Sequence, residues 1–329
     1  TSFDMVYNWG IFDFSTPNFV YRFAKGKLDY LLGAYSYERF LEEYINEGRS
    51  VWSQKLNLTV AEKEKMFELV NENLRPENIR YRYDFFFDNC ATRVRDIIAD
   101  AAADTVIYPV KEKKKSFRQL IDPYQKVLPW LDLGADMLLG LQADRKATVS
   151  DEMFLPVHLR DNLASAVIVH DGKQEPLTGP VETVADLPAA ATIRNTWVPQ
   201  AVFWVVFLFV LLVTFVFKRP ALEKFADFLF FPVYSLIAIL LAFTNIFSEH
   251  DALHFNLLFL GINILIPVLA FLLVAGRKAA KMSRLTLTVS ALWLPASLIA
   301  GQGINPALIP VVLIIMTRIF SHCRFGKSL

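Results

Sequence analysis

One cysteine separates an aromatic stretch from a segment with helical periodicity. Residues 81–87 are mostly aromatic, which predicts a buried strand, and Val94, Ile97 and Ile98 follow at helical spacing. Cys90 is therefore expected where a strand ends and a helix begins. A thiol in that position lies beside the unpaired N–H groups and the positive dipole end of the helix, and both favour a thiolate.

The residues on either side of Cys90 support this interpretation. Asp88 or Asn89 is suited to cap the helix, and Arg93 and Arg95 add positive charge one turn further on. The alternative is that Cys90 is a small buried apolar residue that fills space, as unpaired cysteines usually are. We favour a reactive thiol, because an Asp-Asn-Cys sequence flanked by two arginines is a poor way to build an inert core.

The average composition of the chain hides two different halves. Its 329 residues are 54% hydrophobic with a net charge of +1, but charged residues crowd before about residue 194 and are sparse after it. The near-neutral balance without a basic tract argues against nucleic-acid binding. Cys323 lies in a terminal basic segment, so a disulfide with Cys90 is not expected. The chain opens at Thr1 without a signal-like stretch, so we expect an exported form to have an upstream segment that is removed or not represented.

Strand and helix signals are mixed over the first 180 residues. Residues 4–14 alternate apolar and polar side chains around Gly10, and a second strand is expected with Trp52, Gln54 and Leu56 on one face. Because the helices and strands intermix without regular βαβ repetition, the fold class is α+β.

Turn and cap signals place further elements. Thr59 and Glu62 form a capping box that opens a helix, and residues 131–141 predict another helix. A hairpin is expected to turn at Asp171 and Gly172.

His158 and His170 are the histidines of this first part. We interpret both as surface histidines, because neither sequence neighbourhood offers a partner carboxylate with obvious geometry. Neither is therefore expected to be catalytic.

The second part of the chain has apolar stretches too long for the helices of a soluble core, which predicts an integral membrane protein. Five spans are expected, at residues 197–217, 228–247, 255–275, 285–300 and 307–320, the last two being short. The expected organisation is an extracytoplasmic domain over residues 1–180, a linker over 181–195 and a five-helix transmembrane domain over 196–329.

The charges between the spans predict the orientation in the membrane. Residues 218–224 and 277–284 carry Lys and Arg, whereas residues 248–254 and 301–305 carry neither. By the positive-inside rule the first pair of loops is cytoplasmic. We therefore expect a multi-pass protein with its first domain outside the cytoplasm and its C-terminus inside.

The outer loop around residue 250 concentrates polar side chains at the membrane surface. Glu249, His250, His254 and Asn256 lie there, and ionisable groups at such a position indicate function by default. Histidines four residues apart share a helix face, so metal binding by His250, His254 and Glu249 is one hypothesis. A polar loop that only caps the third span is an equal alternative, and we predict no metal.

An outward-facing thiol suits acyl transfer through a thioester, which needs a base, an orienting group and an oxyanion donor. Residues 83–96, together with residues 7–14 before them and 144–156 after them, resemble the bacterial family of Bacteroides-type lipoprotein N-acyltransferases known as Lnb. The likeness covers most of the first 180 residues, and its Asp-Asn-Cys core is fairly specific. More distantly, an Asn-Cys pair at a helix start is similar to the circularly permuted papain-like thiol enzymes, which include the NlpC-type and lecithin:retinol acyltransferase families.

The resemblance implies a circularly permuted papain-like domain and a thiol acyltransferase without a cofactor. A phospholipid would acylate Cys90, and the N-terminal amine of a diacylglyceryl-cysteine lipoprotein would then take the acyl chain. Asp88, Asn89, Arg93 and Arg95 would assist the thiol. The partners would be the phospholipid donor, the lipoprotein acceptor and the bacterial inner membrane, with the catalytic domain in the periplasm.

The general base is the point at which this chain departs from the family pattern. The family has a Gly-His segment just upstream of the part that matches residues 7–14, which would fall before Thr1. We expect the base there, with His250 or His254 as the alternative. The residues expected to bind substrate are Tyr7, Asn8, Phe12, Tyr81, Tyr83, Arg118, His250, His254 and Asn256.

Two other classes of function stay open. A membrane-anchored cysteine peptidase or amidase that acts on cell-wall peptides would use the same thiol, but it gains little from five spans. A non-enzymatic envelope assembly factor would use Cys90 for packing only. The acyl-chain preference, the phospholipid position and the oligomeric state do not follow from the sequence.

Overall fold

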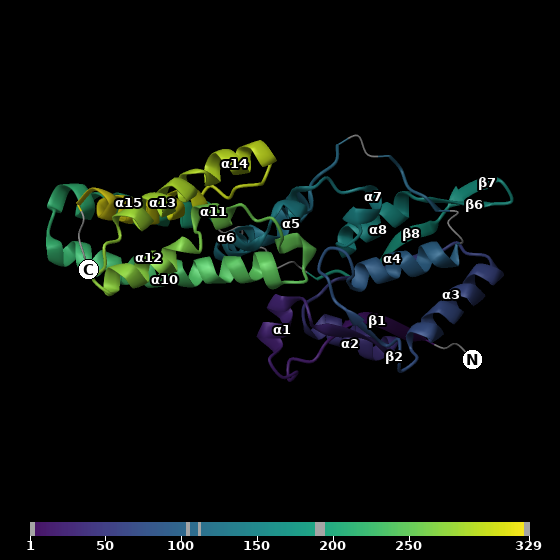
Figure 1. The fold of residues 1–329 in the computed structure, drawn as a ribbon. Coiled ribbons are helices and arrows are strands. Elements are labelled where there is room, and N and C mark those ends of the chain that lie inside the picture. Colours follow the sequence, from purple (N-terminus) through teal and green to yellow (C-terminus); the bar gives the residue numbers. More distant parts are fainter. Residues whose placement is uncertain (1–3, 103–105, 111–112, 188–194, 326–329) are drawn as a thin grey trace. The chain divides into compact units, whose positions relative to one another are not determined.

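The computed structural model describes residues 4–102, 106–110, 113–187 and 195–325 (Figure 1). The chain forms two compact units. Unit 1 comprises residues 1–117 and 146–191, and unit 2 comprises residues 118–145 and 192–329. This division differs from the expected domain of residues 1–180, because residues 118–145 pack with the helical unit.

A three-stranded antiparallel sheet forms the first part of unit 1. Trp9, Leu32 and Tyr81 are buried on it and pack against Val70 and Ile97 from two helices. The strand expected around Gly10 is confirmed as the first strand of this sheet. The sheet has the order β1-β2-β4, from β1 (Met5–Ile11), β2 (Asp29–Ser36) and β4 (Arg80–Arg82).

The strand predicted over residues 81–87 is wrong beyond β4. The chain turns instead, and the backbone groups of Asp84 and Asp88 bond to each other in both directions at 2.9 and 3.1 Å. The Asp84 carboxylate accepts hydrogen bonds from the N–H groups of Phe86 and Phe87. Because this side chain satisfies backbone donors locally, it competes with continuation of the strand.

Two smaller sheets complete unit 1. Strand β3 (Val51–Leu56) pairs with β8 (Thr178–Ala185), so residues 181–185 form a strand where a linker was expected; residues 188–194 of that linker lie outside the described residues. In the other sheet, β5 (Val106–Ile107) pairs with β6 (Val167–His170) and β6 with β7 (Lys173–Pro176). The predicted hairpin turn is confirmed, since Asp171 and Gly172 both have positive φ, at 50° and 75°.

The helices of unit 1 surround these sheets. The predicted capping box is confirmed, because the Thr59 side chain accepts from the Glu62 N–H and the Glu62 carboxylate accepts from the Thr59 N–H. Unit 1 is therefore a mixed α/β unit, and its papain-like permutation stays a prediction. Its helices are α1 (Phe19–Lys25), α2 (Tyr37–Asn46), α3 (Val60–Asn73), α4 (Cys90–Ala101), α7 (Val149–Glu152) and α8 (Pro156–Ser165).

Unit 2 is helical and apolar. Among the described residues, three helical stretches are long and apolar enough to cross a membrane: Val198–Phe217, Pro220–Phe247 and Ala280–Ala300. Leu258–Val274 and Leu308–Cys323 are apolar but shorter, so by length the structure supports three of the five expected spans. The elements are α9 (Val198–Leu211), which continues as the π-helix η2 (Leu212–Phe217), α10 (Pro220–Phe247), η3 (Asp251–Leu253), α11 (Leu258–Gly261), α12 (Leu265–Val274), α13 (Ala280–Ala291), α14 (Trp293–Ala300) and α15 (Leu308–Phe325).

Residues 118–145 pack against the loops and helices of this bundle. The Asn256 side chain donates hydrogen bonds to the carbonyl groups of Met137 and Leu138 at 2.8 and 3.1 Å. A Cβ atom at Gly140 would collide with the His254 carbonyl, so only glycine permits this close approach. The inserted elements are most of α5 (Phe117–Gln125), α6 (Pro129–Leu138) and the 3-10 helix η1 (Leu141–Asp144).

Candidate active site

Cys90 is the first residue of helix α4, as the sequence predicts. The cap is Asn89, whose Oδ1 accepts hydrogen bonds from the N–H groups of Ala91 and Thr92 at 2.9 and 3.0 Å. The Thr92 hydroxyl in turn accepts from the Asn89 N–H at 2.8 Å. These reciprocal bonds fix the start of the helix, and with it the direction in which the Cys90 side chain leaves the backbone.

The Asn89 amide also ties the helix start to two other segments. Its Nδ2 donates to the carbonyl groups of Phe85 and Phe154 at 2.8 and 2.9 Å, and the residue is 4% exposed. All the polar atoms of the side chain are therefore used within unit 1. Asn89 positions the thiol and has no polar atom left to bind a substrate.

Strand β1 passes directly beside the thiol-bearing residue. A Cβ atom at Gly10 would lie 3.8 Å from the Cys90 Cβ and 3.0 Å from Asn8 Oδ1. Asn8 holds this bulged part of the strand, because its Oδ1 accepts from the Gly10 N–H and its Nδ2 donates to the Tyr35 hydroxyl. The first and central segments of the sequence resemblance thus meet at Cys90.

The two arginines that follow Cys90 are engaged with carboxylates. Arg93 forms a bidentate ion pair with Asp88, with Nη2 to Oδ2 at 2.6 Å, and its guanidinium stacks on the Tyr81 ring at 4.4 Å. Arg95 donates to Asp96 at 2.6 Å and to the Ser150 carbonyl at 2.9 Å.

The acid–base state of the thiol differs from the expectation. Burial raises the pKa of the Cys90 thiol, and hydrogen bonds from the N–H groups of Ala91 and Cys90 only partly oppose this rise. Neither Arg93 nor Arg95 is among the groups that lower it. This direction is opposite to the predicted low-pKa thiol held by two arginines, so attack by the thiol near neutral pH would need a base.

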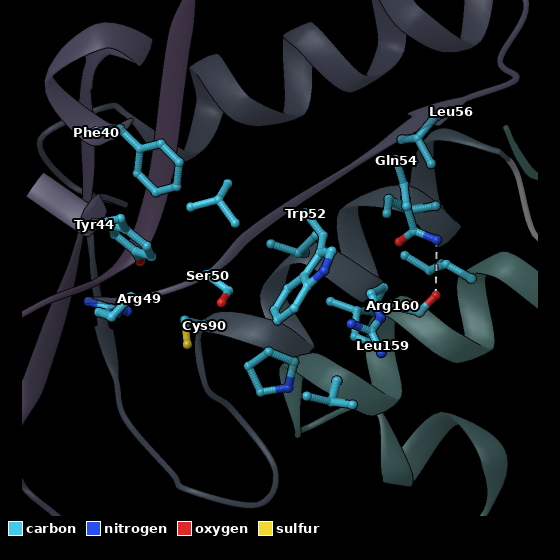
Figure 2. A pocket seen from close by; sticks show the side chains of 16 residues that line it. Phe40, Tyr44, Arg49, Ser50, Trp52, Gln54, Leu56, Cys90, Leu159 and Arg160 are labelled. Carbon is cyan, nitrogen blue, oxygen red and sulfur yellow. Dashed lines mark hydrogen bonds between the residues drawn. The ribbon is translucent and has the colours of Figure 1, made fainter. Parts of the chain in front are cut away.

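An apolar pocket opens beside Cys90. Its volume is about 580 Å³, and Cys90 is one of the residues that line it (Figure 2). Most of the lining is hydrocarbon or aromatic. It includes Val51, Trp52 and Leu56 of β3, Val94 and Ile98 of α4, and Leu159 of α8.

Two cations accompany the apolar lining. The Arg49 guanidinium lies 3.8 Å from the centre of the Tyr44 ring and donates to Glu47 at 2.8 Å. The Arg160 guanidinium lies 4.9 Å from the centre of the Trp52 ring, and all of these residues except Glu47 line the pocket. Stacking on an aromatic ring fixes the plane of a guanidinium without using its hydrogen-bond donors.

These pocket residues were not among the predicted substrate-binding residues. The alternation of side chains in β3 could have indicated part of this lining. The sequence predicts that Trp52, Gln54 and Leu56 share one face of the strand, and all three line the pocket. The contributions of α2 and α8 had no such signal, because they depend on contacts between distant segments.

The aromatic residues expected to bind substrate are not among the residues that line this pocket, and Tyr7, Tyr81 and Tyr83 pack instead in a buried cluster that Cys90 also contacts. Tyr81 is 7% exposed, and its hydroxyl donates to the Trp9 carbonyl at 2.6 Å. Tyr83 stacks on Tyr30 with ring centres 4.0 Å apart. Tyr7 packs against the same buried cluster as Tyr81, and Phe12 contacts Phe14, Phe19 and Tyr30.

No histidine belongs to the pocket lining formed by the described residues. His170 does have a partner carboxylate, contrary to the prediction, since its Nε2 lies 3.0 Å from Glu62 Oε2 in the capping box. His158 Nδ1 lies 3.9 Å from Glu152. The hypotheses of a base before Thr1, or of His250 or His254, stay predictions.

Arg118 is paired within unit 2, and its surroundings give no support to the expected role in substrate binding. It is 6% exposed, and its guanidinium donates to Asp136 at 2.6 Å, to Asp144 at 2.8 Å and to the Leu139 carbonyl at 3.1 Å. Because Nε, Nη1 and Nη2 all donate to groups of the protein, no N–H donor remains for a ligand.

The loop around residue 250 is also built differently from the expectation. His250 and His254 flank η3, a three-residue 3-10 helix, so they do not share the face of an α-helix. His254 Nε2 lies 2.7 Å from the Ser248 carbonyl. Asn256 is 2% exposed, and its amide bonds to Met137, Leu138, Leu258 and Gln302, which leaves it no role at a substrate surface. The substrate-binding role expected of His250 stays a prediction.

One group of carboxylates in unit 2 has the spacing of a cation site. Oxygens of Asp122, Asp132 and Asp136 all lie within 4.8 Å of one another. The Asn305 amide nitrogen donates to Asp132 and Asp136 at 3.3 and 3.0 Å, and Arg118 donates to Asp136. Because these donors already face the carboxylates, we infer no metal centre from the group.

Unit 1 thus presents a capped, half-buried thiol beside an apolar pocket, and unit 2 supplies apolar helices. This combination defines a membrane-anchored protein with a candidate thiol active site. The chain matches the family model of the Lnb N-terminal periplasmic domain over residues 2–122 and that of the Lnb transmembrane domain over residues 192–328. The chain therefore belongs to the Lnb family, which confirms the resemblance. No curated protein and no solved structure matches it significantly.

Proposed function

We propose that this protein is a lipoprotein N-acyltransferase that moves an acyl chain from a phospholipid, through a thioester on Cys90, to the N-terminal amine of a diacylglyceryl-cysteine lipoprotein. The observation that carries this proposal is the position of Cys90 on the lining of a pocket of about 580 Å³ that is mostly apolar. An acyl chain matches such a surface, because burial of each methylene group contributes about 0.8 kcal/mol. Membership of the Lnb family supports the same reaction class.

The first half-reaction forms the thioester. A base takes the thiol proton, and the Cys90 sulfur attacks the ester carbonyl carbon of the phospholipid. The carbon–oxygen bond to the glycerol breaks, and the leaving oxygen takes a proton, so that a lysophospholipid departs. The raised pKa of the thiol makes the base essential near neutral pH.

The second half-reaction consumes the thioester. The amine of the lipoprotein attacks the acyl carbon, the carbon–sulfur bond breaks, and the base passes the proton lost by the amine to the leaving sulfur, which restores both the thiol and the free base. The N-terminal end of α4 stabilises negative charge on the sulfur through its dipole and through hydrogen bonds from the N–H groups of Ala91 and Cys90.

The phosphate of the donor has candidate partners on the lining. Arg49 and Arg160 both line the pocket, and each is oriented by an aromatic ring. Guanidinium groups pair with phosphate through two parallel hydrogen bonds. Because Arg49 also donates to Glu47 and Arg160 to Asp161, a bound phospholipid would place its chain on the apolar lining and its phosphate against the remaining donors of one of these arginines.

We further propose that the protein lies in the bacterial inner membrane with unit 1 in the periplasm and the C-terminus in the cytoplasm. The absence of Lys and Arg from residues 248–254 and 301–305, against their presence in residues 218–224 and 277–284, supports this orientation.

The deciding experiment is to trap the thioester. The full-length protein is incubated with phospholipid vesicles that lack lipoprotein, quenched in acid and digested for mass spectrometry. We expect a hydroxylamine-sensitive long-chain acyl group on Cys90 and none on Cys323, which serves as the internal control. A cell-wall peptide on Cys90 would indicate the peptidase or amidase instead. An unmodified Cys90 in a preparation active in acylation would exclude the thioester route.

A further inference from the structure

Helix α6 has both of its charged side chains inside, while two of its large apolar side chains lie outside. Asp132 and Asp136 are 8% and 7% exposed, whereas Trp130 and Leu131 are 52% and 58% exposed. A Cβ atom at Gly134 would meet nothing within 4 Å, so the open side of the helix continues past it without a polar group. A surface helix in water has the reverse arrangement. The open face of α6 is therefore unsuited to water.

The rotation of α6 about its axis is fixed by polar contacts on the inner side. Arg118 donates to Asp136 at 2.6 Å, and Asn305 donates to both Asp132 and Asp136. Leu133, on the same side, packs in the apolar core of the helical bundle. Turning Trp130 and Leu131 inward would break these contacts and expose two carboxylates, so their outward position is a stable feature of unit 2.

The open face of α6 is continuous with the apolar surface of a membrane helix. The Trp130 ring contacts the Phe203 ring of α9 with centres 6.0 Å apart. Phe203 comes five residues after Val198, the first residue of α9, which at 1.5 Å per residue is roughly 7–8 Å along that helix. Further along α9, Val205 and Phe209 are exposed as a lipid-facing surface requires, at 67% and 53%.

A position beside the first turns of a membrane helix and an apolar open face match a helix that lies in a membrane surface. Such helices bury their apolar face about 5–10 Å into the boundary between headgroups and acyl chains, and tryptophan is enriched at that level. Leu128, the residue just before α6, is 45% exposed and adds to the apolar side chains at the start of the helix. Lys126 forms an ion pair with Asp122 and marks the polar limit of the patch.

We propose that α6, which lies outside every predicted span, is an interfacial membrane helix whose open face, formed by Leu128, Trp130 and Leu131, rests among the phospholipids beside the start of α9. The occupant of this face is the lipid bilayer, because the patch continues the surface of a membrane helix and carries no charge. The inference does not depend on the acyl-transfer reaction, since it concerns unit 2 only.

The test measures the surroundings of α6 in a bilayer. Single cysteines are placed at Leu131, at Lys126 and at Val205 in the full-length chain with Cys90→Ser and Cys323→Ser. Each is labelled with a nitroxide and reconstituted in phospholipid nanodiscs, and collision with lipid-soluble oxygen is compared with collision with a water-soluble nickel chelate. Val205 is the lipid reference and Lys126 the matched aqueous control. We expect the label at residue 131 to favour oxygen, as at 205, and the label at 126 to favour the nickel chelate.

Either of two other results at residue 131 would overturn the proposal. A label at residue 131 that favours the nickel chelate as at 126 would place the face of α6 in water. A label that neither reagent reaches would show that protein covers the face, whether from another part of this chain, a second copy or a lipoprotein. Because all three positions are exposed in the structure, a label there leaves the fold intact, and an unchanged melting temperature in each labelled protein verifies this.

Discussion

Helices α4 and α6 are amphipathic in opposite senses. Helix α4 buries Ile97 and Ile98 and exposes Asp96 and Asp100, as a helix on a water-soluble domain does. Helix α6 buries Asp132 and Asp136 and exposes Trp130 and Leu131. The difference shows that the two units are built for different solvents, although α6 interrupts the sequence of unit 1.

The two helices also use their charges for different purposes. Around α4 the ion pairs, such as Arg93 with Asp88, are partly exposed, so each contributes little to stability. Around α6 the pairs of Arg118 with Asp136 and Asp144 are buried and fully bonded. A buried pair is costly to break, because the remaining partner is left charged and unpaired.

The largest expected effect concerns the thiol at the start of α4. Cys90→Ala should lower acyl transfer by on the order of 10³-fold or more without loss of folding, because the nucleophile is removed. Cys90→Ser should leave only a trace, since a hydroxyl has no accessible anion near neutral pH. The assay is N-acylation of a lipoprotein in vesicles, with Cys323→Ala as the matched control. Normal activity in the alanine variant would exclude the proposed mechanism.

The next effect concerns the buried charges behind α6. Arg118→Ala should lower the free energy of unfolding by about 3–5 kcal/mol, because it leaves Asp136 and Asp144 unpaired in the interior. Arg277→Ala, at an exposed position, should change it little. Thermal unfolding in nanodiscs compares the two. Equal stability of both variants, with a higher KM for phospholipid only in Arg118→Ala, would restore the substrate-binding role.

A third effect should separate substrates by chain length. Val157 lines the Cys90 pocket and is 37% exposed, so Val157→Trp narrows the pocket without forcing a large ring into the core. Acylation of Cys90 by long-chain esters should fall several-fold more than acylation by short-chain esters. Val110→Trp, at a position that is 94% exposed and off the lining, is the control. An equal loss for both chain lengths would mean that the acyl chain does not occupy this pocket.

A fourth prediction concerns the free energy of unfolding that is lost when Asp132, on the inner side of α6, becomes charged. Burial, followed by the charges of Asp136 and Asp122, raises the pKa of Asp132 to about 6. The folded state then holds this proton more tightly than the unfolded state, so stability falls as the pH rises from about 4 to 6 and stays lower above that range. Asp132→Asn should therefore raise the free energy of unfolding at pH 8, by up to about 3 kcal/mol, and not at pH 4. Asp251→Asn, at an exposed position, is the control. An increase in the free energy of unfolding that is the same at pH 4 and pH 8 would contradict the raised pKa of Asp132.

The last prediction is that replacing either arginine after Cys90 leaves the reactivity of the thiol unchanged. Arg93→Ala and Arg95→Ala should leave the pH dependence of Cys90 alkylation unchanged, because each arginine is bound to a carboxylate and burial sets the pKa of the thiol. Iodoacetamide modification of both variants and the wild type should show the same inflection, above that of an exposed thiol. A shift to higher pH in either variant would reinstate the arginine-held thiolate.

The sequence alone determined the local features of the site. The cap at Asn89, the helix that begins at Cys90 and the capping box at Thr59 follow from side-chain bonds to backbone groups within four residues, and the turn at Asp171 and Gly172 follows from two adjacent residues that adopt positive φ. The apolar helices follow from composition over about 20 residues. Such features are visible in sequence because both partners of each interaction are close along the chain.

Only the tertiary structure decided what surrounds these elements. The pocket combines β3, α4 and α8, and the pKa of Cys90 follows from its burial there rather than from the nearby arginines. Likewise, residues 131–141 predict a helix, but the direction of its faces depends on Arg118 and Asn305, which come from distant parts of the chain. Burial, pairing of charges and the solvent that a face meets are properties of contacts between remote segments, and no local pattern contains them.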